Sequence, residues 1–364
     1  MKIVCNSANL AKACSNVQRT VSSKSTIPAI EGILIDALGD NVRLTGYDLE
    51  VGTETYLPAE VEENGSVILN AKNLCDILRM VPDDTVSIES DERNICKIKS
   101  GETEYSLIGT SSEEYPDLPA VSSGFPVVIN QALLKDMIRK TIFSVSTSER
   151  NPVHSGVKFE IEEGKIILVA VDGARLAIRR EDIDYSGETV SFVVPAKTLG
   201  EVIKLSDDDE GYYTISIGKR HICFEVGEYK IISRLLEGNF IDYKAAIPLS
   251  ATTTVTASTR RIIECVERTS LIITDRSSPV RCKIENEMIK LSTVTSIGTA
   301  NDKMSADIEG NDVEIGFNSK FVLDALKACE TDEVKIELNS SNQPILILPT
   351  SGEKFLFLVL PVRI

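Results

Sequence analysis

Three ten-residue segments of this chain share one pattern and limit the folds that it can adopt. They are Asn70–Arg79, Pro195–Lys204 and Asn318–Lys327, with the sequences NAKNLCDILR, PAKTLGEVIK and NSKFVLDALK. Each segment has apolar residues three and four positions apart, which is typical of an amphipathic helix. The segments recur at intervals of roughly 125 residues, so the chain is predicted to hold three copies of one structural unit.

The three copies predict three domains, at residues 1–122, 123–248 and 249–364. Each copy opens with a short β-branched run and a helix, then passes through further strands and the repeated helix to three final strands. Each domain is long enough to bury its own core. The expected fold is α+β, with antiparallel sheets that are covered on one face by helices.

Each repeated segment carries a basic residue at its third position and another at its tenth. The pairs are Lys72 and Arg79, Lys197 and Lys204, and Lys320 and Lys327. A gap of seven residues is close to two turns of a helix, so each pair lies on one helical face, away from the apolar stripe. Ordinary solvated lysines would explain any single pair. Three pairs in register favour a functional cationic surface.

The formal net charge of −16 argues against a protein that binds nucleic acid over its whole surface, because such proteins are usually basic throughout. A local basic surface inside an acidic exterior remains compatible with this charge. Eight cysteines without any C-x-x-C pair indicate reduced, buried thiols and a cytoplasmic protein. The sequence predicts no export signal and no membrane span.

Catalytic chemistry has little support in this sequence. The two histidines, His154 and His221, lie far apart, and the familiar nucleotide-binding, hydrolase and metalloprotease motifs are missing. Neither histidine nor cysteine occurs in pairs with the spacing of metal ligands. We therefore expect no catalytic residue, no metal and no cofactor.

Five further segments carry a resemblance to a known family. They are Leu44–Glu50, Tyr115–Leu118, Val171–Ala177, Phe240–Tyr243 and the C-terminal Leu360–Ile364. In their order and spacing, over essentially the whole chain, they resemble the bacterial DNA polymerase III beta subunit, the DNA sliding clamp. The resemblance implies a head-to-tail homodimer that closes a ring around duplex DNA, with helices lining the hole and sheets outside.

In such a ring, the helix cations would face the phosphates of double-stranded DNA without reading its sequence. The resemblance implies these DNA-facing residues: Lys24, Lys72, Arg79, Lys135, Arg139, Lys140, Lys197, Lys204, Arg260, Arg268, Lys320 and Lys327.

The family also has a pocket for short Gln/Leu/Phe-type peptides from its partners. Those partners are the replicative polymerase alpha subunit, clamp-loader subunits, other polymerases and repair proteins. The implied lining is His154, Val171, Gly173, Arg175, Leu176, Ile241, Ala246, Leu358, Val359, Leu360, Pro361, Val362 and Arg363. His154, Ile241 and Ala245 depart from residues common in the family, so the peptide preference is open.

The dimer interface implied by the resemblance joins Tyr105 and Leu107 of one copy to Leu271 and Ile272 of another. Two other functions stay open at this point. One is a repeat-built scaffold that binds only proteins, without encircling DNA. The other is an enzyme acting on an acidic or phosphorylated substrate.

Overall fold

The structure, a computed structural model, describes residues 1–122, 126–148, 150–206, 210–275 and 278–364. The backbone forms two compact units. The first holds Met1–Ala132 and Lys197–Leu235, and the second holds Leu133–Ala196 and Leu236–Ile364. Both units are discontinuous in the sequence, so neither coincides with one predicted domain.

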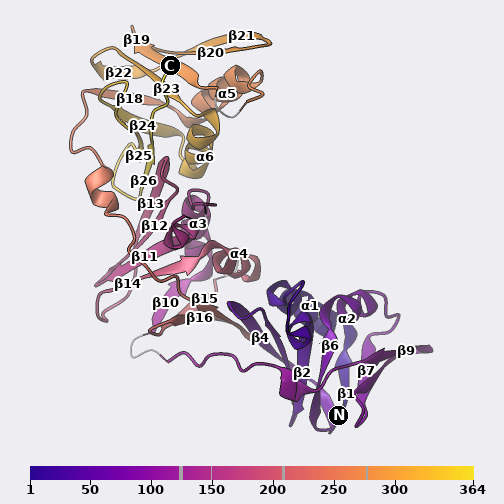
Figure 1. Cartoon of the computed structure of the whole chain (residues 1–364). Coiled ribbons are helices and arrows are strands. Elements are labelled where there is room, and N and C mark those ends of the chain that lie inside the picture. The colour runs from indigo at the N-terminus through magenta and orange to yellow at the C-terminus, as the bar shows by residue number, and fades with distance from the viewer. Residues whose placement is uncertain (123–125, 149, 207–209, 276–277) are drawn as a thin grey trace. The chain divides into compact units, whose positions relative to one another are not determined.

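The first unit contains α1, α2 and most of α4 together with two antiparallel sheets (Figure 1). Its elements are β1 Lys2–Asn6, α1 Ser7–Val17, β2 Gly32–Leu38, β3 Asn41–Tyr47, β4 Val51–Pro58, β5 Glu60–Glu63, β6 Gly65–Asn70, α2 Ala71–Leu78, β7 Thr85–Ser90, β8 Ile95–Ser100, β9 Thr103–Ile108, β10 Val127–Asn130, α4 Ala196–Leu205, β15 Tyr212–Ile217, β16 His221–Val226 and β17 Tyr229–Arg234.

The second unit contains most of α3 with α5, α6 and two further antiparallel sheets. Its elements are α3 Gln131–Ile142, β11 Gly156–Glu162, β12 Lys165–Val171, β13 Arg175–Asp182, β14 Val190–Pro195, β18 Thr253–Ser258, α5 Thr259–Ser270, β19 Val280–Glu285, β20 Met288–Thr295, β21 Gly298–Ser305, β22 Asp307–Gly310, β23 Val313–Phe317, α6 Ser319–Cys329, β24 Glu333–Leu338, β25 Ile345–Pro349 and β26 Phe355–Val359.

The repeated segments form α2, α4 and α6, as the apolar spacing predicts. An asparagine begins two of them. Asn70 Oδ1 accepts a hydrogen bond from the backbone N–H of Asn73 at 3.1 Å, and Asn318 Oδ1 accepts one from Lys320 at 3.0 Å. Such caps satisfy donors that the helix itself leaves unpaired. Asn6 caps α1 in the same way, and the hydroxyl of the next residue, Ser7, donates to the Asp83 carbonyl.

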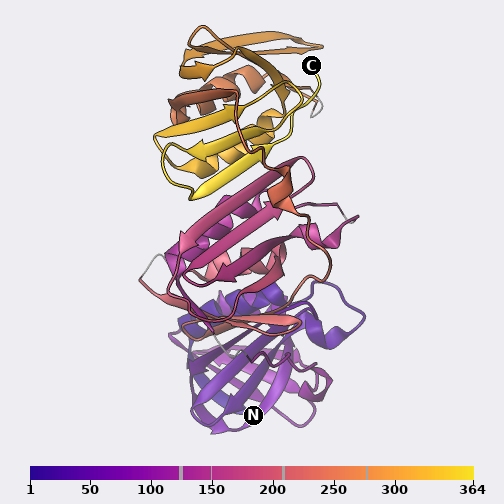
Figure 2. The same cartoon turned by 90° about the vertical axis from the view of Figure 1, so that its left-hand side faces the viewer.

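One sheet in each unit joins strands from two predicted domains. In the first unit, the order β10-β15-β16-β17-β4-β3-β2-β6 brings β17 beside β4. In the second unit, the order β14-β11-β12-β13-β26-β25-β24-β18-β22 brings β13 beside β26, a continuity visible in Figure 2. These backbone ladders explain why the compact units do not follow the domain boundaries.

The smaller sheets, β5-β1-β7-β8-β9 and β21-β20-β19-β23, each end in an open edge strand. Their inner faces pack against helices. Leu10 of α1 and Leu74 of α2 are fully buried with the apolar side chains of β1 and β8, and Val266 of α5 and Leu326 of α6 are buried in a corresponding core. The predicted α+β layout of three tandem domains, with helices on one face of antiparallel sheets, is confirmed.

Candidate functional site

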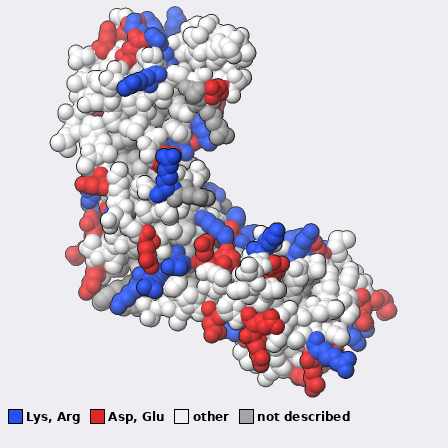
Figure 3. Space-filling model, in the orientation of Figure 1, with Lys and Arg blue, Asp and Glu red and all other residues white. Residues whose placement is uncertain are grey.

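The six cations of the repeated helices all lie on exposed faces. Lys72, Arg79, Lys197, Lys204, Lys320 and Lys327 are exposed, while the apolar stripes of α2, α4 and α6 are buried. Figure 3 shows Lys and Arg side chains along the surface that α1 and α2 form, and Asp and Glu side chains on the strand side of the same unit. The prediction that these cations stand off the apolar stripe is confirmed.

Four of these six cations have a carboxylate partner. Arg79 pairs with Asp76 at 2.9 Å, Lys204 with Glu201 at 2.7 Å, Lys327 with Glu267 at 2.7 Å, and Lys197 with Asp48. Among the residues that the structure describes, Lys72 and Lys320 have no ion-pair partner. Exposed pairs are weak, so a ligand phosphate can compete for the paired cations and meets Lys72 and Lys320 without competition.

The other predicted cations divide into exposed and enclosed ones. Lys24, Arg139, Arg260 and Arg268 are exposed, and Lys135 is half-buried. Lys140 is enclosed, because its ammonium group lies 2.6 Å from Asp136 and 2.9 Å from Glu330 with its side chain only 12% exposed. Both carboxylates neutralise Lys140, and its role in facing DNA stays a prediction.

Two cations extend the predicted set: Lys12 of α1 and Arg19 of the short 3₁₀ helix Gln18–Thr20 that follows it. Lys12 and Arg19 are exposed, and both line a hollow of about 520 Å³ in the first unit that Lys204 also borders. They are seven residues apart, as in the repeated helices, so the same spacing rule finds them in the sequence.

The predicted peptide pocket centres on an apolar cluster of the second unit. Val171, Leu176 and Leu358 are buried in it together with Tyr243. Leu176 and Leu358 are direct neighbours across the β13–β26 ladder. Ile241, next in the chain to Phe240 which packs against the cluster, is 47% exposed, and Leu360, which follows β26, is 41% exposed. Half-exposed aliphatic side chains beside a buried cluster offer area to an apolar ligand.

The turn between β12 and β13 is built around Asp172. Its Oδ1 accepts hydrogen bonds from the backbone N–H groups of Ala174 at 3.0 Å and Arg175 at 3.1 Å. Gly173 has a φ of +88°, a conformation that favours glycine. Leu360 donates its backbone N–H to the Ala174 carbonyl at 2.8 Å, so this turn also holds the C-terminal segment in place.

Arg175 faces the helices rather than the apolar cluster. Its guanidinium contacts Asp172 at 2.8 Å and Asp324 of α6 at 2.6 Å, and it lies over the rings of Phe143 and Phe321. Val359, its partner across the ladder, packs in the core beneath α5 and α6. Because side chains alternate along a strand, Arg175 and Val359 lie on the opposite face from Leu176 and Leu358. The contact of Arg175 and Val359 with a peptide stays a prediction.

The remaining predicted pocket residues surround the cluster. The His154 imidazole contacts the Phe240 ring edge-on at a centroid distance of 5.2 Å, and burial lowers its pKa. Ala246, Gly173 and Arg363 are exposed, and Pro361 and Val362 are half-buried. Val362 donates its backbone N–H to the Gly316 carbonyl at 2.8 Å, which fixes the chain next to the rim.

Two of the predicted interface residues lie on an edge strand, and the other two follow helix α5. Tyr105 and Leu107 are half-buried on β9, the last strand of its sheet. Leu271, which follows α5, is 81% exposed, and Ile272 is half-buried. Arg268 of α5 reaches Asp302 of β21 at 2.7 Å, so the end of α5 lies beside the other open edge strand.

The described residues hold no group of three or more histidine, cysteine, aspartate or glutamate side chains placed to bind a metal ion. Among the same residues, no helix has the length and apolar character needed to cross a membrane. All eight cysteines are unpaired and buried, as the sequence predicts, and burial raises the pKa of Cys5 to about 11.

Models of three protein-family domains match the chain in succession. The DNA polymerase III beta subunit N-terminal domain matches residues 1–119, its central domain residues 128–242 and its C-terminal domain residues 244–363.

Full-length relatives agree with these matches. The chain is 33% identical to a beta sliding clamp of Bacillus subtilis over 376 residues, covering 100% of each chain, and 33% identical to one of Staphylococcus aureus over 356 residues, covering 95% and 94%. The crystal structure of the Bacillus subtilis DNA polymerase sliding clamp superposes with a TM-score of 0.98 at 33% identity, covering 100% of this chain and 99% of that one. The crystal structure of a putative DNA polymerase III beta subunit from Eubacterium rectale superposes with a TM-score of 0.97 at 33% identity, covering 100% of both chains. The chain therefore belongs to the DNA polymerase III beta subunit family, the beta sliding clamps, and is a processivity factor without a catalytic site of its own.

Proposed function

We propose that two copies of this chain close head to tail into a ring around duplex DNA, and that the ring tethers the replicative polymerase during synthesis. The observation that carries the proposal is the matched set of exposed cations on α2, α4 and α6 in a chain of net charge −16. Cations that meet only phosphates hold DNA without sequence preference, which permits sliding.

The DNA path that we propose uses Lys24, Lys72, Arg79, Lys135, Arg139, Lys197, Lys204, Arg260, Arg268, Lys320 and Lys327, with Lys12 and Arg19 added. Lys72 and Lys320 are its strongest members, since neither has an ion-pair partner among the described residues. Lys140 acts indirectly, because Asp136 and Glu330 already neutralise it.

The apolar cluster of Val171, Leu176 and Leu358 is the proposed seat for the short peptides of partner proteins, with Ile241 and Leu360 as its rim. Buried aliphatic area gives such a site affinity, and a few polar groups orient the ligand. Arg175 serves it as a positioning residue that holds the Asp172 turn. The partners are the polymerase alpha subunit, clamp-loader subunits, and other polymerases and repair proteins.

We further propose the domain boundaries 1–122, 123–248 and 249–364 and a cytoplasmic location. The buried, unpaired state of the eight thiols supports a reducing compartment. Tyr105, Leu107, Leu271 and Ile272 supply apolar area to the contact between copies.

The test compares how long the loaded protein stays on circular and on linear duplex DNA at moderate salt, with a competent clamp loader present. Retention on circles together with loss from linear ends is the expected result, because a ring slides off an open end. Equal retention on both would show ordinary contact binding and overturn encirclement.

A further inference from the structure

Two strand ladders inside the chain follow the same rule. Each joins the third strand after the first helix of one domain to the last strand of the next domain. In the first unit these strands are β4 and β17, and in the second unit they are β13 and β26. Both ladders are antiparallel. The corresponding strand of the third domain is β21, and the last strand of the first domain is β9, and both are open edges.

The register of the two ladders can be measured from equivalent hairpins. The hairpin before the joining strand contains a ladder pair whose members are five residues apart: Tyr47 and Gly52 in one domain, Val171 and Leu176 in the next, and Val294 and Thr299 in the third, where one further pair, Thr295 and Gly298, lies nearer the turn. Gly52 pairs with Ile232 across the first ladder, and Leu176 pairs with Leu358 across the second. Thr299 is the equivalent position on β21.

The position on β9 follows from its own hairpin. β16 and β17 close with the pair Val226 and Tyr229 around Gly227, which has a φ of +52°. β8 and β9 close in the same way with Ser100 and Thr103 around Gly101, which has a φ of +56°. Ile232 lies three residues after Tyr229, so its equivalent lies three residues after Thr103. That residue is Ser106.

We propose that β21 of one copy pairs with β9 of a second copy in this register, and that Lys303 lies between Glu102 and Glu104 of that copy as the ion pair that specifies the dimer. The proposal rests on the ring proposed above and goes beyond it by fixing register and charge. Ser106 opposite Thr299 places Glu104 opposite Asn301 and Glu102 opposite Lys303, since antiparallel neighbours run in opposite directions. Glu102, Glu104, Asn301 and Lys303 are all exposed.

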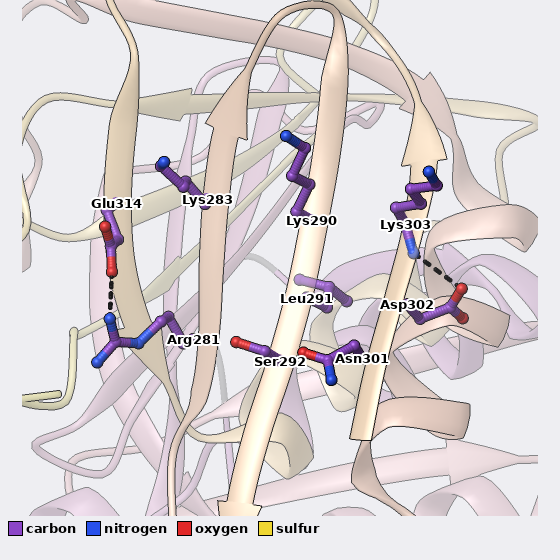
Figure 4. Close-up of a pocket in the computed structure, with 9 residues that line it drawn as sticks. All are labelled: Arg281, Lys283, Lys290, Leu291, Ser292, Asn301, Asp302, Lys303 and Glu314. Atoms are coloured by element: carbon purple, nitrogen blue, oxygen red, sulfur yellow. Dashed lines mark hydrogen bonds and ion pairs between the residues drawn. The ribbon is translucent and has the colours of Figure 1, made fainter. Parts of the chain in front are cut away.

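Lys303 stands at the edge of a row of lysines on the face of β19, β20 and β21. Lys283 is opposite Lys290, and Lys290 is opposite Lys303, so three lysines stand in one row across three strands (Figure 4). Like charges directly opposite one another destabilise a sheet. Glu285 neutralises the first two, at 2.7 Å from each. Within the described residues Lys303, at the open edge, has no ion-pair partner, and it borders a hollow of about 640 Å³.

The charge polarity of this contact also excludes a wrong pairing. In the first internal ladder, Lys230 of β17 is opposite Glu54 of β4, so the last strand is basic there and the joining strand is acidic. The proposed contact reverses both signs. An acidic β9 is therefore repelled by Glu54 of β4 and attracted by Lys303 of β21, which favours closure between copies over mispairing.

The test uses two oppositely charged variants of the full chain, Lys303→Glu and the double variant Glu102→Lys/Glu104→Lys, studied by sedimentation equilibrium. Each alone should dimerise at least about tenfold more weakly than the unmodified protein, because both contacts of its ring place like charges together. Mixed in equal amounts, the two should form heterodimers of nearly unmodified strength, since both contacts then pair opposite charges. Lys283→Glu, in the same row but two strands from the edge, is the matched control and should leave dimerisation unchanged.

The outcomes separate this proposal from the ring itself. An unmodified protein that stays monomeric at every concentration tested would overturn the ring, and with it this contact. An unmodified protein that dimerises while both variants dimerise equally well would overturn only the register and the ion pair. The register and the ion pair would also be overturned if mixing the weakened variants fails to restore the dimer although each remains folded by circular dichroism.

Discussion

Nη1 of Arg175 on β13 lies 2.6 Å from Oδ2 of Asp324 on α6, a contact between residues 149 positions apart in the chain. The side chain of Arg175 is 9% exposed and also contacts Asp172. Removing one member of a buried ion pair leaves the other charge without compensation.

Arg175→Ala should therefore lower the free energy of unfolding by about 3–5 kcal/mol, measured by guanidinium denaturation. The unfolding free energy of Arg175→Lys should lie between those of the unmodified protein and of Arg175→Ala, because a single ammonium group cannot reach both carboxylates as a guanidinium does. Arg281→Ala removes a half-exposed pair with Glu314 and should cost at most about 1 kcal/mol. Equal effects of Arg175→Ala and Arg281→Ala would refute the role given to Arg175.

The triple variant Lys72→Glu/Lys197→Glu/Lys320→Glu should keep its fold and lose retention on circular DNA. Each replacement puts a negative charge where a phosphate is proposed, so affinity should drop at least about tenfold and depend less steeply on salt. Lys97→Glu/Lys99→Glu/Lys165→Glu changes the net charge equally on exposed strand positions and is the control. Unchanged retention in the first variant would contradict the proposed DNA path.

Ile241→Ser/Leu360→Ser should weaken binding of a Gln/Leu/Phe-type peptide about tenfold or more, because the rim loses the aliphatic area that covers the ligand. Both residues are half-exposed in the free chain, so the unfolding free energy should change little. Leu249→Ser is the control, because this leucine is fully exposed and lies outside the cluster. It should leave the affinity for the peptide unchanged. Fluorescence anisotropy with a labelled peptide measures the peptide affinity of the unmodified protein and of both variants. A tight complex with the double variant would place the site elsewhere.

His154 should make stability depend on pH. Burial lowers the pKa of its imidazole from the usual value near 6.5, so the unfolded chain takes up this proton at higher pH than the folded chain. The resulting loss of unfolding free energy should begin as pH falls through 6.5 and should be absent above that value. His154→Leu should remove this component when unfolding is measured between pH 8 and pH 5. An identical pH profile in that variant would show that the imidazole is not the source.

The eight thiols should resist labelling in the native protein. All are buried, and burial raises the pKa of Cys96 and Cys223 to about 12, so little reactive thiolate forms at neutral pH. An aromatic disulfide reagent should label none of them quickly in buffer and all eight in guanidinium. Fast labelling of any thiol in buffer would show an accessible site that the fold does not provide.

Local sequence patterns predicted the helices well. Apolar spacing located α2, α4 and α6 to within two residues, and the cation spacing placed Lys72 and Lys320 on exposed faces. These properties depend on neighbours within one or two helical turns. A repeating pattern in the sequence is sufficient to predict them.

Contacts between distant segments were not predictable in this way. The local sequence does not distinguish Lys140 from the exposed cations of the helices. Its enclosure depends on Glu330, which lies 190 residues later in the chain. The orientation of Arg175 depends on which face of β13 meets α6. The β4–β17 ladder crosses a domain boundary that the three sequence repeats predicted. No local period encodes such pairings, because they are set by tertiary packing.

The β4–β17 ladder has a consequence for synthesis on the ribosome. β4 ends at Pro58 and β17 begins at Tyr229, so roughly 170 residues must be translated before the edge of β4 can be covered. At about 5–20 residues per second, the nascent first domain exposes an unpaired edge for roughly 10–35 seconds. Glu54 lies on that edge, and a charge there discourages pairing with other nascent chains.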